Sequence, residues 1–239
     1  MRYRSQWRDR PDLHRLPVPS IKSHYRRDNT TVNGIASDCT RVSDSSGDTR
    51  SMPARLTLIC HGATAATRAS AFPLDEPLEE GVEEQARKLG LSLRRWNRAV
   101  TSPALRARQT AEALSLNAVV DTALRDCDYG RWSGRKLADI QAAHPADVTT
   151  WLSDSEAAPH GGESLRALML RVSEWMAARL HDNGHTIAVT HASVIRAAVV
   201  DVLGAPSESF WQIDVDPLSL VDLRSDKQRW ALRVSQYRR

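Results

Sequence analysis

The segment Arg55-Leu-Thr-Leu-Ile-Cys-His-Gly62 decides the fold class, because its apolar run leads directly into a histidine and a glycine. Residues 55–59 are predicted to form a strand that becomes buried at its end. A second run, Thr186-Ile-Ala-Val-Thr190, has the composition of a fully buried strand and is also followed by a histidine, His191. Short apolar runs of this kind are typical of parallel sheets that are covered on both faces.

Helical patterns alternate with predicted strands along the rest of the chain. The strongest start signal lies at Ser102 and Pro103, which suit the N-cap and the first position of a helix. The predicted helices cover residues 77–96, 103–114, 137–143, 146–152, 163–180 and 192–203, and the other strands cover 98–101, 119–120 and a C-terminal hairpin of 218–223 and 230–234. This alternation indicates an α/β fold, a three-layer α/β/α sandwich with a mostly parallel central sheet.

The first 51 residues differ from the rest in charge and periodicity. They contain 10 Lys or Arg and 6 Asp or Glu, so they account for the whole net charge of +4, and the remaining 188 residues are neutral overall. They follow neither a strand nor a helix period, which indicates disorder. A presequence or a basic nucleic-acid arm is less consistent with so many acidic residues. We expect a dispensable, disordered basic extension at 1–51 and one domain at 52–239, with Met52 as its working start.

The composition disfavours several classes of protein. No run approaches the roughly 18 consecutive apolar residues of a membrane span, and the Arg-rich N-terminus lacks the apolar core of a secretory signal. Cys39, Cys60 and Cys127 have no CxxC spacing, which suits reduced thiols. A neutral folded part lacks the basic field typical of nucleic-acid binding. We expect a cytoplasmic protein without nucleic-acid or membrane partners, and the oligomeric state stays open.

Polar groups follow three predicted strands at their carboxyl ends. These are His61 with Gly62, the segment 102–106 with Arg106, and His191. Open parallel sheets bind ligands at this edge. Gly62 would let the backbone approach a ligand closely, and a helix beginning at Ala192 would offer free N–H groups. Two histidines and an arginine at one edge therefore predict a phosphate site.

Five segments resemble, in the same order, the signatures of the histidine phosphatase, or phosphoglycerate-mutase-like, superfamily. The first signature normally contains Arg-His-Gly-x-Thr, and its counterpart here is Leu58-Ile-Cys-His-Gly-Ala-Thr64. Each segment alone is a weak signal, but five in order over residues 55–200 are specific. The other four are Thr101-Ser-Pro-Ala-Leu-Arg-Ala-Arg-Gln-Thr-Ala111, Leu124-Arg-Asp-Cys-Asp-Tyr-Gly-Arg-Trp132, Gly161-Gly-Glu-Ser164 and Val189-Thr-His-Ala-Ser193.

The resemblance implies a mechanism. His61 would attack phosphorus and carry the phosphoryl group as phosphohistidine. Asp126 would be the proton donor, at a position where many relatives have Glu, and bound phosphate would raise its pKa. Arg106 and a protonated His191 would stabilise the phosphoryl oxygens.

The resemblance also limits the activity. A domain of 188 residues leaves little room for the segments with which mutases enclose their substrate, so a phosphatase is expected. Gly62 and Thr64 would contact the substrate, and no cofactor or metal is implied. The substrate would be a small phosphorylated metabolite, with α-ribazole phosphate and sugar phosphates both open, and residues 130–162 would form the lid that selects it.

One departure from the signature bears on activity. The superfamily's Arg before the nucleophile is Cys60 here, which removes a bidentate phosphate ligand. Arg68, in the loop after the first strand, is a candidate replacement in the substrate site. The alternative is a weakened enzyme, or a catalytically inactive relative that binds a phospholigand or acts as a regulator.

Two rival sites also involve Cys60. A cysteine phosphatase requires Cys-x5-Arg, but Ala66 stands six residues after Cys60, so this site is excluded. A zinc site could use Cys60, His61, Cys127 and His191, which are residue types that zinc prefers. The phosphatase and the zinc site differ in whether purified protein holds tightly bound metal.

Overall fold

The computed structural model describes residues 53–93 and 95–234. This part of the chain is the domain downstream of the basic segment. The predictions of a disordered extension at 1–51 and of a working start at Met52 concern residues outside it.

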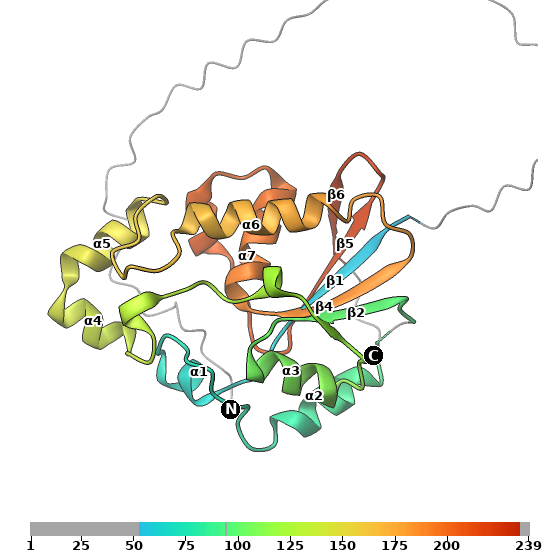
Figure 1. Cartoon of the computed structure of the whole chain (residues 1–239), viewed down its shortest axis with the longest axis horizontal. Coiled ribbons are helices and arrows are strands. Elements are labelled where there is room, and N and C mark those ends of the chain that lie inside the picture. The colour runs from blue at the N-terminus through green and yellow to red at the C-terminus, as the bar shows by residue number, and fades with distance from the viewer. Residues whose placement is uncertain (1–52, 94, 235–239) are drawn as a thin grey trace, which may run out of the picture. The chain divides into compact units, whose positions relative to one another are not determined.

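A six-stranded mixed sheet with the order β3-β2-β4-β1-β5-β6 forms the centre of the domain (Figure 1). Its first four strands in that order are parallel, and β5 and β6 add an antiparallel hairpin beside β1. These strands confirm the predicted ones and the predicted hairpin. They are β1 (Arg55–Cys60), β2 (Arg98–Thr101), β3 (Val119–Val120), β4 (His185–Thr190), β5 (Leu220–Ser225) and β6 (Trp230–Arg233).

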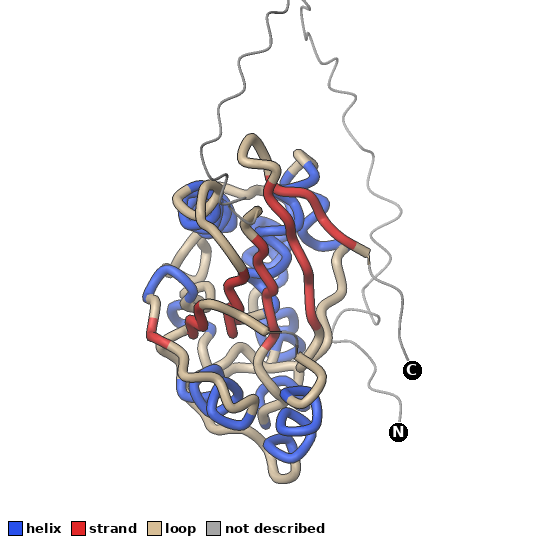
Figure 2. Tube along the Cα trace, turned by 90° about the vertical axis from the view of Figure 1, so that its right-hand side faces the viewer, coloured by secondary structure: helices blue, strands red, loops and turns tan. Residues whose placement is uncertain are grey.

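Helices cover both faces of the sheet, as Figure 2 also shows from the side. Along β1, Leu56 and Leu58 are buried with α6 and α7, whereas Ile59 is buried on the opposite face with α2 and α3. This alternation follows from the period of two along a strand. It confirms the predicted α/β/α sandwich. The covering helices are α2 (Val82–Gly90), α3 (Leu105–Ala113), α6 (Leu165–Ala177) and α7 (Ala192–Leu203).

A separate apolar cluster lies in the region between β3 and α6. It includes α4 (Leu137–Ala143) and α5 (Pro145–Ser153), at the left of Figure 1, which confirm the two predicted short helices to within one residue. The rings of Trp132 and Trp151 meet edge to face with centroids 5.4 Å apart, a favourable arrangement for aromatic pairs. The buried members of the cluster are Phe72, Trp132, Ile140, Val148 and Trp151.

The helix predicted at 77–96 is shorter in the structure. α2 begins after Gly81, whose φ of 80° lies in the left-handed region and interrupts helical geometry. Leu78, which fits the helical period, instead forms an isolated β-bridge with Thr64. The apolar spacing before Val82 therefore reflects a loop that packs against the domain. A short helix that the sequence did not predict, α1 (Ala65–Ala69), precedes this loop.

The predicted helix start at Ser102 and Pro103 is wrong by two to three residues. α3 begins at Leu105, and the N-cap residue Ala104 provides no side-chain bond. Asp75 supplies the cap from another segment, because its Oδ1 accepts a hydrogen bond of 2.7 Å from the Leu105 N–H. The Ser102 hydroxyl instead accepts from the Ala104 N–H at 3.3 Å and lies 2.7 Å from His191 Nε2.

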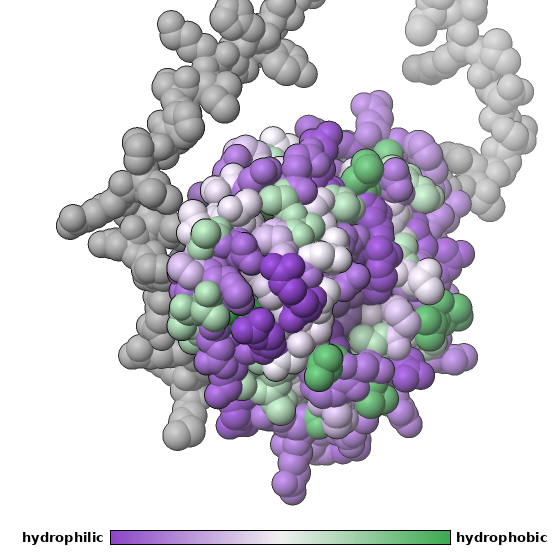
Figure 3. Space-filling view, turned by 60° about the vertical axis from the view of Figure 1, so that its left-hand side comes forward, coloured by the Kyte–Doolittle hydropathy of each residue, from purple (hydrophilic) through white to green (hydrophobic). Residues whose placement is uncertain are grey.

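The face shown in Figure 3 is mostly hydrophilic, with apolar residues scattered over it. Scattered apolar residues are ordinary on protein surfaces. Within the described ranges, none of the helices has the length and apolar character needed to cross a membrane.

Shortening a buried side chain in the central strand β4 should measure how much the apolar core contributes to the stability of the domain. Ile187 in β4 is fully buried, so Ile187→Ala should lower the free energy of unfolding by roughly 2–5 kcal/mol and Ile187→Val by roughly 0.5–1.5 kcal/mol. Leu170→Ala on α6, where the side chain is 59% exposed, is the control and should change it far less. Chemical denaturation measures all three, and equal losses at both positions would contradict this description of the core.

Candidate active site

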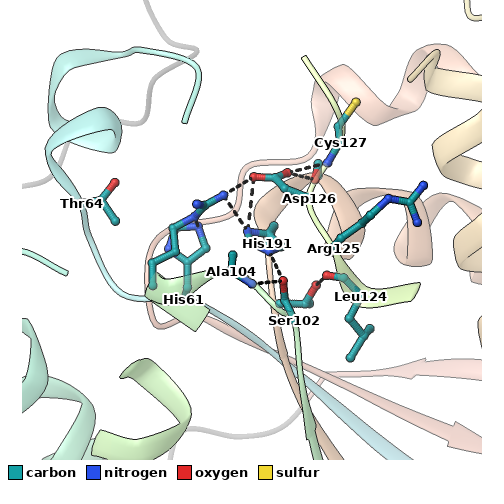
Figure 4. Close-up of polar contacts among 12 residues, drawn as sticks. His61, Thr64, Ser102, Ala104, Leu124, Arg125, Asp126, Cys127 and His191 are labelled. Carbon is teal, nitrogen blue, oxygen red and sulfur yellow. Dashed lines mark hydrogen bonds and ion pairs between the residues drawn. The ribbon is translucent and has the colours of Figure 1, made fainter. Parts of the chain in front are cut away.

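The carboxyl ends of β1 and β4 bring two histidines together. The two strands pair in parallel with Cys60 opposite Thr190, so His61 and His191 leave the sheet side by side. Their ring centroids are 5.1 Å apart, and both rings are buried. Asp126 from the loop after β3 reaches the same place (Figure 4). Arg106 from α3 joins them through contacts to His61 and Asp126. The structure thus assembles four residues that lie far apart in the sequence.

His61 is held with one ring nitrogen available for attack. Its Nδ1 lies 2.7 Å from the Gly62 carbonyl, which can only accept, so Nδ1 carries the proton and Nε2 has a lone pair. Burial, followed by the nearby Arg106 guanidinium, lowers the pKa of His61 to about 4. The ring is therefore neutral at pH 7, which is the nucleophilic form of imidazole.

Arg106 is a buried cation that contacts each of the other three residues. Its Nε donates to His61 Nε2 at 3.2 Å, and its Nη2 lies 2.8 Å from Asp126 Oδ2 and 3.3 Å from His191 Nδ1. Its Nη1 donates to the Leu74 carbonyl at 2.8 Å. The hydrogen bonds to His61, Asp126 and the Leu74 carbonyl fix the guanidinium plane, and a fixed guanidinium is a good ligand for a phosphoryl oxygen.

His191 is oriented by the hydroxyl of Ser102, the residue that the sequence predicts as a helix cap. Ser102 Oγ lies 2.7 Å from His191 Nε2, which leaves Nδ1 facing Asp126 Oδ2 at 3.3 Å. With Nδ1 protonated, Nε2 accepts from Ser102 and Nδ1–H points at the carboxylate. Burial lowers the pKa of His191 to about 3, although Asp126 opposes this. The expectation of a protonated His191 concerns the site with phosphate bound, and it stays a prediction.

Asp126 has two carboxylate oxygens in different surroundings. Oδ1 accepts from Ser193 Oγ at 2.5 Å and from the Cys127 N–H at 2.9 Å, while Oδ2 faces Arg106 and His191. Burial alone would raise the pKa of Asp126, but His191, Arg106 and Ser193 outweigh it and hold the pKa well below its usual value. Asp126 is therefore a carboxylate in this arrangement.

Cys60 does not face the other site residues as a ligand would. Its side chain belongs to the apolar core together with Leu56 and Leu58, which point toward α6 and α7. Burial, reinforced by Asp126, raises the pKa of the Cys60 thiol to about 12, so it is a neutral thiol at pH 7. A neutral buried thiol is neither a nucleophile nor an oxyanion ligand.

Arg68 lies apart from the four assembled residues. Its guanidinium forms a bidentate pair with Glu79, at 2.7 and 2.5 Å, and its side chain is 75% exposed. This pairing holds it at the surface, so the structure does not place Arg68 where the missing arginine of the signature would act.

Gly62 and Thr64 differ in their relation to the site. A Cβ at Gly62 would come within 2.3 Å of Val82 Cγ1, so the close approach that requires glycine is to α2 and not to a ligand. Thr64 lines the cavity beside His61, but its hydroxyl caps α1 and donates to Glu76 at 3.0 Å.

A cavity opens beside His61 and Asp126. Its outer wall consists of α1 and the residues after it, with Tyr129 and Leu137 from the region between β3 and α6. Ser193 and Arg196, two residues of α7 one helical turn apart, also line it. The sequence analysis did not single out either residue. Ser193 and Arg196 are three residues apart, which places them on one face of the helix after His191, and this spacing was the available signal.

Potential metal ligands do not cluster in the part of the chain that the structure describes. Among residues 53–93 and 95–234, His, Cys, Asp and Glu side chains form no group of three or more that could hold a metal ion. The thiol of Cys127 instead faces the backbone carbonyls of Asp128 and Glu163.

Comparison with protein families agrees with this geometry. The family model described as "Histidine phosphatase superfamily (branch 1)" matches residues 56–237. The chain belongs to the histidine phosphatase superfamily. The resemblance of the five sequence segments is thereby confirmed, and with its phosphatase relatives it makes the chain a phosphatase.

Three similar proteins illustrate the relationship. Phosphoserine phosphatase 1 of Hydrogenobacter thermophilus is 28% identical over 65% of this chain and 78% of its own length. A mycobacterial glucosyl-3-phosphoglycerate phosphatase, solved in complex with VO3, is 29% identical, with a TM-score of 0.66 over 75% of this chain and 97% of its own. A putative α-ribazole-5'-phosphate phosphatase of Escherichia coli is 26% identical, with a TM-score of 0.69 over 77% and 96%.

The two arginines that the sequence proposed for phosphate should behave differently. Arg106→Ala should lower kcat/KM for an aryl phosphate by roughly 10²–10³-fold, the usual loss for one transition-state donor. Arg68→Ala, the matched control, should lower it less than about threefold, because the Arg68 side chain is exposed and pairs with Glu79. Steady-state kinetics on both variants checks this. A larger loss for Arg68→Ala would mean that this side chain turns inward when substrate binds.

Proposed function

We propose that this histidine phosphatase hydrolyses small phosphomonoesters through a phosphohistidine on His61. The observation that carries the proposal is the position of His61 Nε2, which lies 3.2 Å from Arg106 Nε, while the His191 ring lies 5.1 Å from the His61 ring between centroids. These are the groups that an in-line attack on phosphorus requires: a nucleophile and donors for the phosphoryl oxygens.

In the first step, a bond forms between His61 Nε2 and phosphorus while the bond from phosphorus to the ester oxygen breaks. Asp126 gives its proton to the departing oxygen, which leaves as an alcohol. In the second step, water attacks the phosphohistidine, Asp126 takes a proton from that water, and the bond to Nε2 breaks. The products are inorganic phosphate and the enzyme with Asp126 protonated, as at the start of the first step, and the carboxylate forms again when phosphate and this proton leave.

Asp126 begins this sequence as a carboxylate bound to Arg106 and His191, which are also the expected phosphate ligands. Phosphate would displace the carboxylate from these two partners and place a second negative charge beside it. Both effects raise the pKa of Asp126. We infer that substrate binding is coupled to proton uptake by Asp126, so that the acid is protonated only when there is an ester to receive its proton.

The substrate class rests on the cavity and on the relatives. The cavity beside His61 is lined by α1, Phe72, Pro73, Tyr129 and Leu137, and we propose that these residues surround the leaving group. Of them, Leu137 lies within the predicted lid at 130–162. Two of the relatives are named for phosphatase activity on phosphoserine and glucosyl-3-phosphoglycerate, and a third is described as a putative α-ribazole-5'-phosphate phosphatase. We propose a small phosphorylated metabolite of this kind, and the relatives favour an enzyme over the inactive alternative.

The domain limits and location belong to the same proposal. We propose a catalytic domain at 52–239, supported by a first strand at Arg55 and a family match that starts at residue 56. A cytoplasmic location is supported by the free thiols of Cys60 and Cys127.

Rapid acid-free quenching should trap the intermediate. Wild-type protein mixed with a ³²P-labelled phosphomonoester should carry label that is lost in acid and stable in alkali, as a phosphoramidate bond is. His61→Ala should carry none, because imidazole Nε2 is the attacking atom. Peptide mapping identifies the labelled residue. Label on Cys60, or label that persists in His61→Ala, would refute the proposed nucleophile.

Asp126→Asn separates binding from turnover. Without the competing carboxylate, inorganic phosphate should inhibit the variant about tenfold more tightly, since a negative charge beside the oxyanion is removed. kcat should fall roughly 10²–10⁴-fold with loss of the general acid. Product-inhibition kinetics gives both values. Unchanged or weaker phosphate affinity would show that Asp126 does not compete with phosphate for Arg106 and His191.

A further inference from the structure

We propose that Ser193 is a positioning residue that determines which oxygen of Asp126 carries the transferred proton. The inference rests on the proposed function, because it concerns the proton that Asp126 gives to the leaving group. It starts from the unequal surroundings of Oδ1 and Oδ2.

Oδ1 is occupied by two donors that phosphate does not need. Ser193 Oγ lies 2.5 Å from it and the Cys127 N–H lies 2.9 Å from it. The backbone N–H can only donate, and the hydroxyl donates to a carboxylate. A proton on Oδ1 would require at least one of these hydrogen bonds to break or reverse, so Oδ1 keeps the negative character.

Oδ2 faces donors that the substrate competes for. Arg106 Nη2 lies 2.8 Å from Oδ2 and His191 Nδ1 lies 3.3 Å from it. When a phosphoryl group takes these donors, Oδ2 loses its partners while Oδ1 keeps both of its own. A proton taken up from solvent then binds to Oδ2, on the side of the carboxyl group where the ester lies. The same oxygen receives the proton of the attacking water in the second step.

The fold makes Ser193 a rigid donor. Ser193 is buried in the first turn of α7, two residues after His191, which is the N-cap of that helix. One helix end therefore sets the position of both groups that touch Asp126 from this side. On the other side, Thr190 Oγ1 donates to the Leu124 carbonyl at 2.8 Å, and Arg171 contacts the carbonyls of residues 123, 125 and 126.

Other charged or titratable groups also act on Asp126 or respond to it, and Ser193→Ala keeps all of them. Arg106 comes from α3, His61 and Cys60 from the end of β1, and His191 from the end of β4. The remaining ones are Cys127 and Tyr129 from its own loop and Arg171, which contacts its backbone from α6.

The test compares leaving groups in Ser193→Ala. An alkyl phosphate requires a proton on its leaving oxygen, whereas 4-nitrophenyl phosphate leaves as a stable anion and requires it less. We expect kcat/KM to fall at least about tenfold more for the alkyl ester than for the aryl ester. Removing a donor to the carboxylate also raises the pKa of Asp126, so the pH profile of kcat should move to higher pH.

Three variants control the comparison. Ser193→Thr keeps the hydroxyl and should restore the wild-type ratio of the two esters. Ser193→Cys keeps the volume with a weaker donor and should show the same selective loss, so it serves if Ser193→Ala does not fold. Ser153→Ala removes an exposed hydroxyl that donates to the Thr149 carbonyl on α5, and should change turnover of neither ester.

An equal loss for both esters in Ser193→Ala and Ser193→Cys, with no movement of the pH profile, would overturn the inference and leave a structural role for Ser193. Different results would refute the proposed function itself. These are no turnover of either ester by the wild-type protein, or turnover that persists in His61→Ala.

Discussion

The parallel pairing of β1 with β4 is the constraint on which the site depends. Their register places Cys60 opposite Thr190, and the His61 N–H extends the ladder by donating to the Thr190 carbonyl at 2.9 Å. His61, the proposed nucleophile, and His191 therefore directly continue the two central strands. Because a one-residue shift would turn every side chain to the other face, the buried residues of both strands protect this register.

Arg106 is the charge around which the rest is arranged. A buried guanidinium is tolerated only with hydrogen-bonding partners, and removal of one partner leaves a costly unpaired charge. Here the partners are His61, Asp126 and the Leu74 carbonyl. These partners stabilise the buried charge of Arg106 when no ligand is bound. A phosphoryl group could replace the interactions of Arg106 with His61 and Asp126, so the same guanidinium could bind an anion.

Much of this could be predicted from the sequence, for identifiable reasons. Strong apolar runs predicted β1 and β4, and the His191–Ala192 junction predicted the start of α7, because local pattern and tertiary burial agree there. Ser102 was misassigned because Asp75, about 30 residues away in sequence, caps α3 instead. The position of Arg68 depends on its pairing with Glu79, in a segment whose apolar spacing had predicted a helix. The lowered pKa of His191 depends on burial by the fold. Such long-range and environmental effects leave no mark on local sequence.

The thiol of Cys60 has a consequence for the chemistry of oxidation. Phosphatases that use a cysteine nucleophile need a thiolate, and a thiolate is the form that peroxides and thiol reagents attack. In the proposed mechanism the attacking atom is an imidazole nitrogen, and the adjacent sulfur of Cys60 is 2% exposed and protonated at neutral pH. The residue that departs from the superfamily signature therefore adds no redox sensitivity to the nucleophile, so that phosphoryl transfer and the thiol chemistry of the surrounding solution stay independent.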